Sequence, residues 1–153
     1  MSVVLGKYFE DFEEGMEFKT PARTVTEADV VNFACFSGDF NPLHCDAVYA
    51  SETVFGERIA HGMCGFSIAM GLLVRLNILE GTIVAFYGID KWRFTAPIKL
   101  GTTIHVVAKV IQKESKRPEH GLVVFNLDVV DQDGNTVMTG VIKTLMMKKH
   151  PES

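Results

Sequence analysis

The segment that most limits how this chain can fold is its longest apolar stretch, residues 59–79. A membrane span would have to bury the polar side chains inside this stretch at a high free-energy cost. These side chains are His61, Ser67, Arg75 and Asn77. The stretch therefore predicts part of a soluble core. From residue 62 to about residue 76 its apolar residues cover more than one side of a helix, which indicates a helix surrounded by protein.

The second half of the chain supplies segments that could surround this helix. Four runs are rich in β-branched and aromatic residues and are separated by turn signals, as is typical of strands. They are residues 83–94, 103–113, 122–131 and 137–148. Residues 131–135 predict a hairpin turn, and residues 113–120 a longer solvated one. The expected fold class is α+β, with one long central helix wrapped by a curved antiparallel sheet.

Shorter elements are expected upstream of the central helix. Residues 16–25 alternate enough to form a first strand, and Thr26 begins a capping sequence for a helix that runs to about Phe36. Gly38 is well placed to end that helix. A further short helix is expected over residues 47–53.

Composition narrows the class of protein. A chain of 153 residues, 47% hydrophobic, is long enough for one core, so we interpret residues 1–153 as a single domain. The formal charge of −4 argues against nucleic acid as the main partner. Without a secretory signal or a membrane span, a cytoplasmic location is expected. Cys35, Cys45 and Cys64 match no zinc-ligand spacing, so three reduced thiols and no metal are expected.

The chemistry-bearing part of the chain is a pair of short motifs. Residues 37–44 read Ser-Gly-Asp-Phe-Asn-Pro-Leu-His, and residues 60–63 read Ala-His-Gly-Met at the start of the central helix. Asp39 and His44 are five positions apart, and the intervening sequence does not favour a regular helix. A carboxylate and an imidazole in such a turn can both face one water molecule, as hydration chemistry requires.

These motifs resemble a known family. Residues 38–44 together with residues 59–63 are similar to the signature of the MaoC-like dehydratases, the (R)-specific enoyl-CoA hydratases. The likeness extends to residues 8–15, 23–29 and 92–97. It implies a hotdog fold that forms dimers or higher homo-oligomers. It also implies addition of water to trans-2-enoyl-CoA thioesters, giving (R)-3-hydroxyacyl-CoA, with no cofactor.

The resemblance assigns roles to individual residues. Asp39 and His44 match the catalytic pair, and the backbone N–H of Gly62 would face the oxyanion that develops on the thioester. Asn41 would orient Asp39 or brace the turn. His61 is a candidate substrate contact, although capping or packing at the helix start is the preferred interpretation.

Two methionines are candidate contacts for the acyl chain. Met63 follows the second motif, and Met70 stands where some members of the family carry a serine. Flexible methionine side chains suit variable acyl chains, but core packing is the more common role.

Other functions stay open at this point. A hotdog thioesterase and a non-catalytic acyl-CoA-binding subunit are the alternatives, because fold alone does not decide the reaction. The acyl group, and whether CoA or an acyl carrier protein bears it, are not determined by the sequence. No basic residue has a spacing that singles it out for the CoA phosphates. Homodimerisation is the minimum assembly expected.

Overall fold

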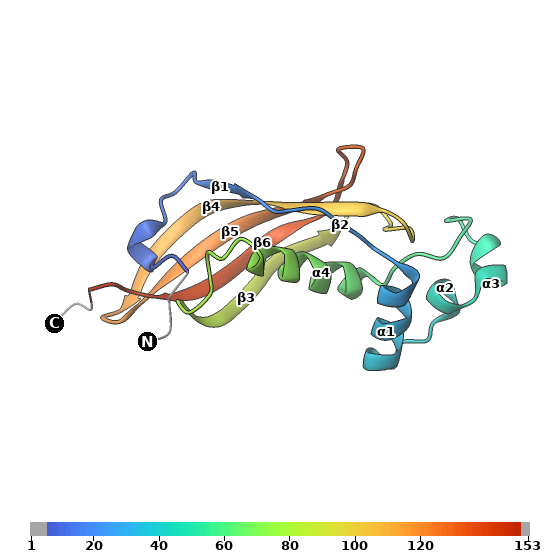
Figure 1. Cartoon of the computed structure of the whole chain (residues 1–153), viewed down its shortest axis with the longest axis horizontal. Helices are drawn as coiled ribbons and strands as arrows, with labels where there is room; N and C mark the ends of the chain where they lie inside the picture. Colours follow the sequence, from blue (N-terminus) through green and yellow to red (C-terminus); the bar gives the residue numbers. More distant parts are fainter. Residues whose placement is uncertain (1–5, 151–153) are drawn as a thin grey trace.

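A curved antiparallel sheet forms the body of the molecule in this computed structural model, which describes residues 6–150 (Figure 1). Its strands are β1 (Glu17–Lys19), β2 (Arg23–Thr24), β3 (Ile83–Phe94), β4 (Thr103–Arg117), β5 (His120–Val130) and β6 (Thr136–Met147). The order across the sheet is β1-β4-β5-β6-β3, and β2 also pairs with β4. Sequence patterning predicts all four long strands, and β3 has the predicted bounds.

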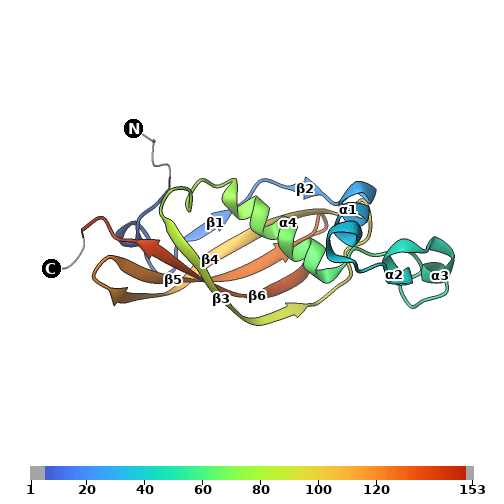
Figure 2. The ribbon, with the colours of Figure 1, turned by 90° about the horizontal axis from the view of Figure 1, so that it is seen from below.

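The long helix α4 (Gly62–Val74) crosses the concave side of the sheet (Figures 1 and 2). Its sheet-facing residues are buried: Cys64, Gly65, Phe66, Ile68, Ala69, Leu72 and Leu73. Alternate residues of β4, such as Val106 and Ala108, are also fully buried in the same core. A stripe on the other side of α4 is exposed and comprises Met63, Ser67, Gly71 and Val74. The expectation of a helix surrounded by protein is therefore met on the sheet side only.

Helix α1 (Glu27–Ser37) begins and ends where its sequence predicts. The Thr26 hydroxyl accepts a hydrogen bond from the backbone N–H of Asp29, whose carboxylate accepts one from the backbone N–H of Thr26. Gly38 ends the helix with a φ of 77°, a left-handed conformation that glycine adopts without steric cost.

Three other segments differ from the sequence-based expectation. The single strand expected over residues 16–25 is divided into β1 and β2, because Pro21 lies between them and has no N–H to donate. Strand β4 continues to Arg117, so the expected turn over residues 113–120 is a short connection instead. The motif turn contains a one-turn helix, α2 (Pro42–Cys45), with proline at its first position.

Helices α2 and α3 (Ala47–Ser51) project beyond the end of the sheet (Figure 2). Helix α1 lies between this projection and the N-terminal end of α4, so the two sequence motifs meet at this end of the molecule (Figure 1). Among residues 6–150, no helix combines the length and hydrophobicity needed to cross a bilayer.

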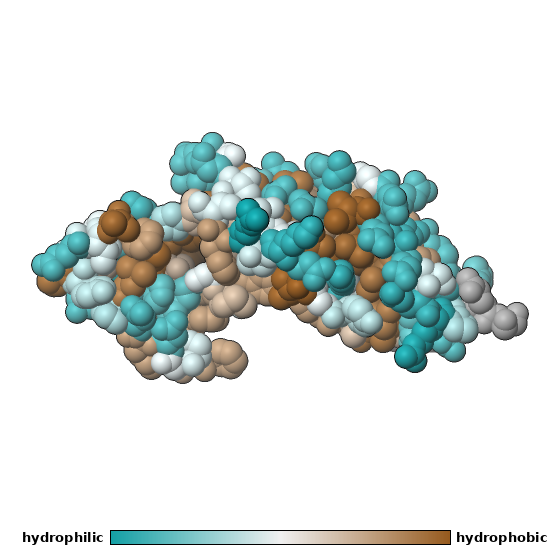
Figure 3. Space-filling model, turned by 180° about the vertical axis from the view of Figure 1, so that it is seen from behind, coloured by the Kyte–Doolittle hydropathy of each residue, from teal (hydrophilic) through white to brown (hydrophobic). Residues whose placement is uncertain are grey.

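Strand β3 forms one edge of the sheet and exposes large apolar side chains. They are Val84, Phe86, Tyr87, Ile89 and Phe94. The β3 side, seen from behind in Figure 3, carries hydrophobic surface among hydrophilic groups. Irregularities in the pairing of β3 with β6 interrupt the ladder at three places.

Candidate active site

Asp39 is held by the loop that follows α1. Its backbone N–H donates to the hydroxyl oxygen of Ser37 at 3.2 Å, and its carboxylate oxygen Oδ1 accepts from the backbone N–H of Asn41 at 3.2 Å. The residue is exposed, so the other carboxylate oxygen can face a bound molecule. These local bonds are of the kind that Asp forms readily in turns.

Asn41 begins helix α2 and thereby fixes His44. The Asn41 side-chain oxygen accepts from the N–H of Leu43 at 3.0 Å, and the Asn41 backbone carbonyl accepts from the N–H of His44 at 2.9 Å. These two bonds are of the kind that the bracing role predicted for Asn41 requires. Its side chain does not line the pocket that holds Asp39 and His44, so a contact with substrate stays a prediction.

The imidazole of half-buried His44 is anchored by one nitrogen. Its Nδ1 lies 2.8 Å from the backbone carbonyl oxygen of Ile59. Because a carbonyl oxygen only accepts hydrogen bonds, Nδ1 carries the proton in this contact. In the neutral ring, Nε2 is then an unprotonated base.

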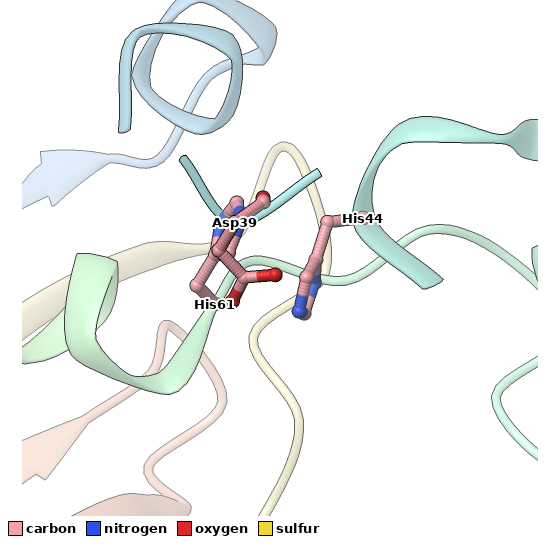
Figure 4. A group of neighbouring side chains, drawn as sticks. All are labelled: Asp39, His44 and His61. Atoms are coloured by element: carbon pink, nitrogen blue, oxygen red, sulfur yellow. The ribbon is translucent and has the colours of Figure 1, made fainter. Parts of the chain in front are cut away.

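His61 joins this pair from the start of α4. Its ring stacks on His44 with centroids 3.9 Å apart, and its Nε2 lies 2.9 Å from the backbone carbonyl oxygen of Asp39. Figure 4 shows the three side chains together, with the Asp39 carboxylate pointing toward His44. One potential ligand atom from each of the three lies within 4.8 Å of the other two. A single water molecule can bridge polar groups at such separations.

The pair opens into a cavity of about 720 Å³ whose walls are largely apolar. Its apolar walls include Phe33, Phe55, Met63, Phe94, Ile98 and Met138. Gly62 also lines it, at the first position of α4, where the backbone N–H has no acceptor within the helix. A Cβ on Gly62 would lie 2.8 Å from the Phe94 ring, so glycine permits this close approach.

The structure thus brings together Asp39, His44, His61, Gly62 and Met63 from the two motifs. Met70 lies apart from them: it is half-buried against the core and does not line this cavity. His61 is 3% exposed and stands at the N-cap position of α4, where its side chain makes no capping bond.

Several wall residues are absent from the sequence-based prediction. Phe33, Phe94 and Met138 come from α1, β3 and β6, and they meet only through the folding of distant segments. No spacing marks them in the sequence. The resemblance over residues 92–97 is the one signal that points toward Phe94 and the adjoining loop.

An ion pair near His44 connects two segments of the chain. Arg58 makes two hydrogen bonds to Glu27, at 2.7 and 2.6 Å, and so connects the segment after α3 to the start of α1. These bonds lower the pKa of the Glu27 carboxyl and raise that of the Arg58 guanidinium.

The three cysteines are unpaired, as expected, but only Cys64 is buried. Burial raises the pKa of its thiol, and the nearby charge of Asp29 acts in the same direction. Cys35 and Cys45 are exposed. A thiol with a raised pKa is a poor nucleophile near neutral pH, so Cys64 belongs to the core rather than to the chemistry.

Asp39, His44 and His61 are close enough to be considered as metal ligands. Each imidazole, however, has one nitrogen bonded to a backbone carbonyl, and the two ring planes are only 29° apart. A nitrogen lone pair lies in the plane of its ring, so two stacked rings in nearly parallel planes are poorly arranged to bind one ion together. This geometry favours a water bridge between Asp39 and His44 over a metal ion shared by all three residues.

Comparison with known proteins identifies the family. The family model of the MaoC like domain matches residues 11–132, which include both motifs and most of the sheet. The chain belongs to the MaoC-like domain family. This result confirms the resemblance seen in residues 38–44 and 59–63.

Curated relatives of this MaoC-like domain differ in length. Protein MaoC of Klebsiella aerogenes is 47% identical over 100 residues, which make up 65% of this chain and 29% of that protein. The chain thus spans less than a third of that relative. An (R)-specific enoyl-CoA hydratase of Rhodospirillum rubrum is 37% identical over 103 residues, which make up 67% of this chain and 69% of the hydratase.

Solved structures share the architecture of this MaoC-like domain. A monoamine oxidase regulatory protein from Archaeoglobus fulgidus superposes with a TM-score of 0.89 at 37% identity, covering 94% of this chain and 96% of that one. A Mycobacterium tuberculosis protein with a double hotdog fold, 18% identical, superposes with a TM-score of 0.83 over 99% of this chain and 47% of its own. The domain has the hotdog fold.

Proposed function

We propose that this MaoC-like domain is an (R)-specific hydratase that adds water to trans-2-enoyl-CoA thioesters and releases (R)-3-hydroxyacyl-CoA. The observation that carries the proposal is the Asp39 carboxylate, which points toward the His44 ring in an apolar cavity that the start of α4 also lines. The similarity to the Rhodospirillum rubrum hydratase supports the same reaction class.

In the proposed reaction the pair accepts one proton and gives one back. A water molecule held between Asp39 and His44 gives one proton to the pair as its oxygen attacks the β-carbon of the enoyl group. The π bond between the α- and β-carbons is lost, and its electrons move toward the thioester carbonyl. The pair returns one proton to the α-carbon, which completes the addition of one water. Because the two side chains act on the same water, their titration belongs to the pair.

Gly62 would stabilise the charge that develops on the thioester oxygen. Its N–H lacks a partner within α4 and stands at the positive end of the helix dipole. Loss of such a donor typically slows catalysis by ~10²–10³-fold. The apolar walls of the cavity would hold the acyl chain beside this donor.

We further propose that the chain acts as a homodimer or a larger homo-oligomer in the cytoplasm. Edge strand β3 supports this assembly, because its unpaired side and exposed apolar residues suit pairing with a second subunit. The same residues would otherwise be an aggregation hazard. An acyl carrier protein thioester is an alternative form of the substrate.

The product's stereochemistry tests the proposal. Purified protein is incubated with a short trans-2-enoyl-CoA, and the product is offered separately to dehydrogenases specific for (R)- and for (S)-3-hydroxyacyl-CoA. Oxidation by the (R)-specific enzyme alone supports the proposal. Oxidation by the (S)-specific enzyme, or an unchanged enoyl thioester across a panel of acyl groups and carriers, contradicts it.

A further inference from the structure

One buried imidazole touches both members of the candidate catalytic pair. His61 Nε2 lies 2.9 Å from the backbone carbonyl of Asp39, so this nitrogen carries a proton and donates it. The same ring stacks on His44 at 3.9 Å between centroids. Phe33 contacts the His61 ring as well, with centroids 4.9 Å apart. His61 is therefore held on more than one side while it contacts both residues.

The segment that carries His61 is itself fixed to the sheet region. The N–H of Ala60 donates to the carbonyl of Ile98 at 2.8 Å, and Ile59 forms an isolated bridge with Lys99. The carbonyl of Ile59 accepts the bond from His44 Nδ1. Residues 59–61 thus anchor His44 through their backbone and Asp39 through a side chain.

The surroundings of the second ring nitrogen of His61, Nδ1, argue against a role in core packing alone. Nδ1 is buried and finds no hydrogen-bond partner within residues 6–150. A buried acceptor without a donor is unfavourable, and an apolar ring would fill the same space without this cost. Histidine at this position is thus better explained by its Nε2 bond to Asp39 than by stability.

Substrate contact is a poor explanation for the same residue. Although His61 forms part of the cavity wall, only 3% of its surface is exposed. We propose that His61 is a positioning residue: its Nε2–H holds the Asp39 backbone and its ring supports His44, so that both face the same water. This inference rests on the proposed hydratase function.

Two amide substitutions separate the bond to Asp39 from other roles. In His61→Gln the amide nitrogen takes the place of Nε2 and can still donate to the Asp39 carbonyl. In His61→Asn the amide nitrogen takes the place of Nδ1, which has no partner in the described structure. The two variants lose the ring equally, so Asn is the matched control for Gln.

The expected result is a difference in kcat at a nearly constant KM. His61→Asn is expected to lower kcat by up to about 100-fold, as misplacement of a reacting group does, and His61→Gln is expected to retain much more of the activity. Melting temperatures measured in parallel are expected to be similar for the two variants. Equal loss of kcat in both, or a raised KM with kcat unchanged, would overturn the inference.

An NMR measurement separates this inference from the hydratase proposal. The resonance of the Asp39 carbonyl carbon reports its hydrogen bond whether or not the protein turns over the chosen substrate. It is expected to shift in His61→Asn and to stay near its wild-type position in His61→Gln. The same resonance in wild type and both variants would overturn the positioning role, whereas inactivity of the wild-type protein across enoyl thioesters would overturn the hydratase proposal alone.

Discussion

Asp39 and His44 are each anchored through one atom, which leaves a second atom free for chemistry. Oδ1 of Asp39 accepts the Asn41 N–H, and Nδ1 of His44 donates to the Ile59 carbonyl. The second carboxylate oxygen and Nε2 are then available in the cavity. Such fixed side chains can act on water without first changing conformation.

Substituting either member of the pair is expected to remove activity and preserve the fold. For Asp39→Asn and His44→Ala we expect kcat to fall by about 10²–10⁴-fold, the usual contribution of general acid–base catalysis. Asp39 is exposed and His44 is half-buried, so neither substitution opens a fully buried core position. Steady-state kinetics and circular dichroism on the same samples check both statements. Near-wild-type turnover by both folded variants would refute the assignment.

Two methionines of α4 are expected to respond differently to truncation. Met63 is 50% exposed and lines the cavity, whereas Met70 packs against the core away from it. Met63→Ala should change the preference for acyl-chain length with little loss of stability. Met70→Ala should lower the free energy of unfolding, by less than the ~2–5 kcal/mol of a fully buried methionine, and leave the preference unchanged. A change in acyl preference for Met70→Ala alone would reverse this interpretation.

At the scale of elements, the start of α1 depends on a reciprocal cap. Thr26→Ala removes the hydroxyl that bonds Asp29, and a loss of about 0.5–2 kcal/mol in the free energy of unfolding is expected. Urea denaturation measures it, with Thr26→Ser as the control because serine keeps the hydroxyl. A Thr26→Ser variant as unstable as Thr26→Ala would show that the cap does not stabilise the helix.

The same cap predicts a dependence of stability on pH. Burial alone would raise the pKa of the Asp29 carboxyl, but hydrogen bonds from Thr26 and the charge of Arg23 outweigh it and hold the pKa below 3.8. The stabilisation is thus present above the ordinary pKa and is lost as pH falls through the lowered value. Asp29→Asn should weaken this acid sensitivity in urea denaturation at successive pH values. An unchanged pH profile in Asp29→Asn would contradict this origin.

Local signals in the sequence predict elements well where one mechanism decides the structure. Gly38 ends α1 through its left-handed conformation, and β3 follows its apolar run from Ile83 to Phe94. Sequence patterning does not predict the extension of β4 beyond residue 113, because the residues there are charged and polar and gain their strand structure by pairing with β5. Pro21 marks the break between β1 and β2 in the sequence, because proline has no N–H to donate to a neighbouring strand.

For the whole molecule, the position of the site follows from tertiary contacts. Motif residues such as Asp39 and Gly62 are recognisable in the sequence, because the role proposed for each depends on local backbone geometry. The cavity walls are not, since Phe33, Phe94 and Met138 are brought together only by the packing of α1, β3 and β6. The sequence also does not indicate that one side of α4 is exposed to solvent, because apolar residues alone do not show which side of a helix packs against the sheet.

Disruption of the β3 edge is expected to separate the proposed dimer. Ile89 and Ile111 are strand isoleucines with similar exposure, 41% and 44%, but only Ile89 lies on β3. Ile89→Lys should lower the mass measured by analytical ultracentrifugation to that of a single chain, because it buries a charge in the interface. Ile111→Lys is the matched control and should keep the wild-type mass. The same mass for both variants would exclude pairing through β3.

The most direct test of the account follows the enoyl double bond and the thioester in one experiment. Ultraviolet absorbance of the conjugated enoyl thioester and release of free thiol are recorded together across a short panel of trans-2-enoyl-CoAs, with Asp39→Asn as the control. The account predicts that wild-type protein removes the absorbance without releasing thiol and that Asp39→Asn does so far more slowly. Thiol release by the wild type would indicate a thioesterase, and equal rates of absorbance loss for the two proteins would contradict the role of Asp39.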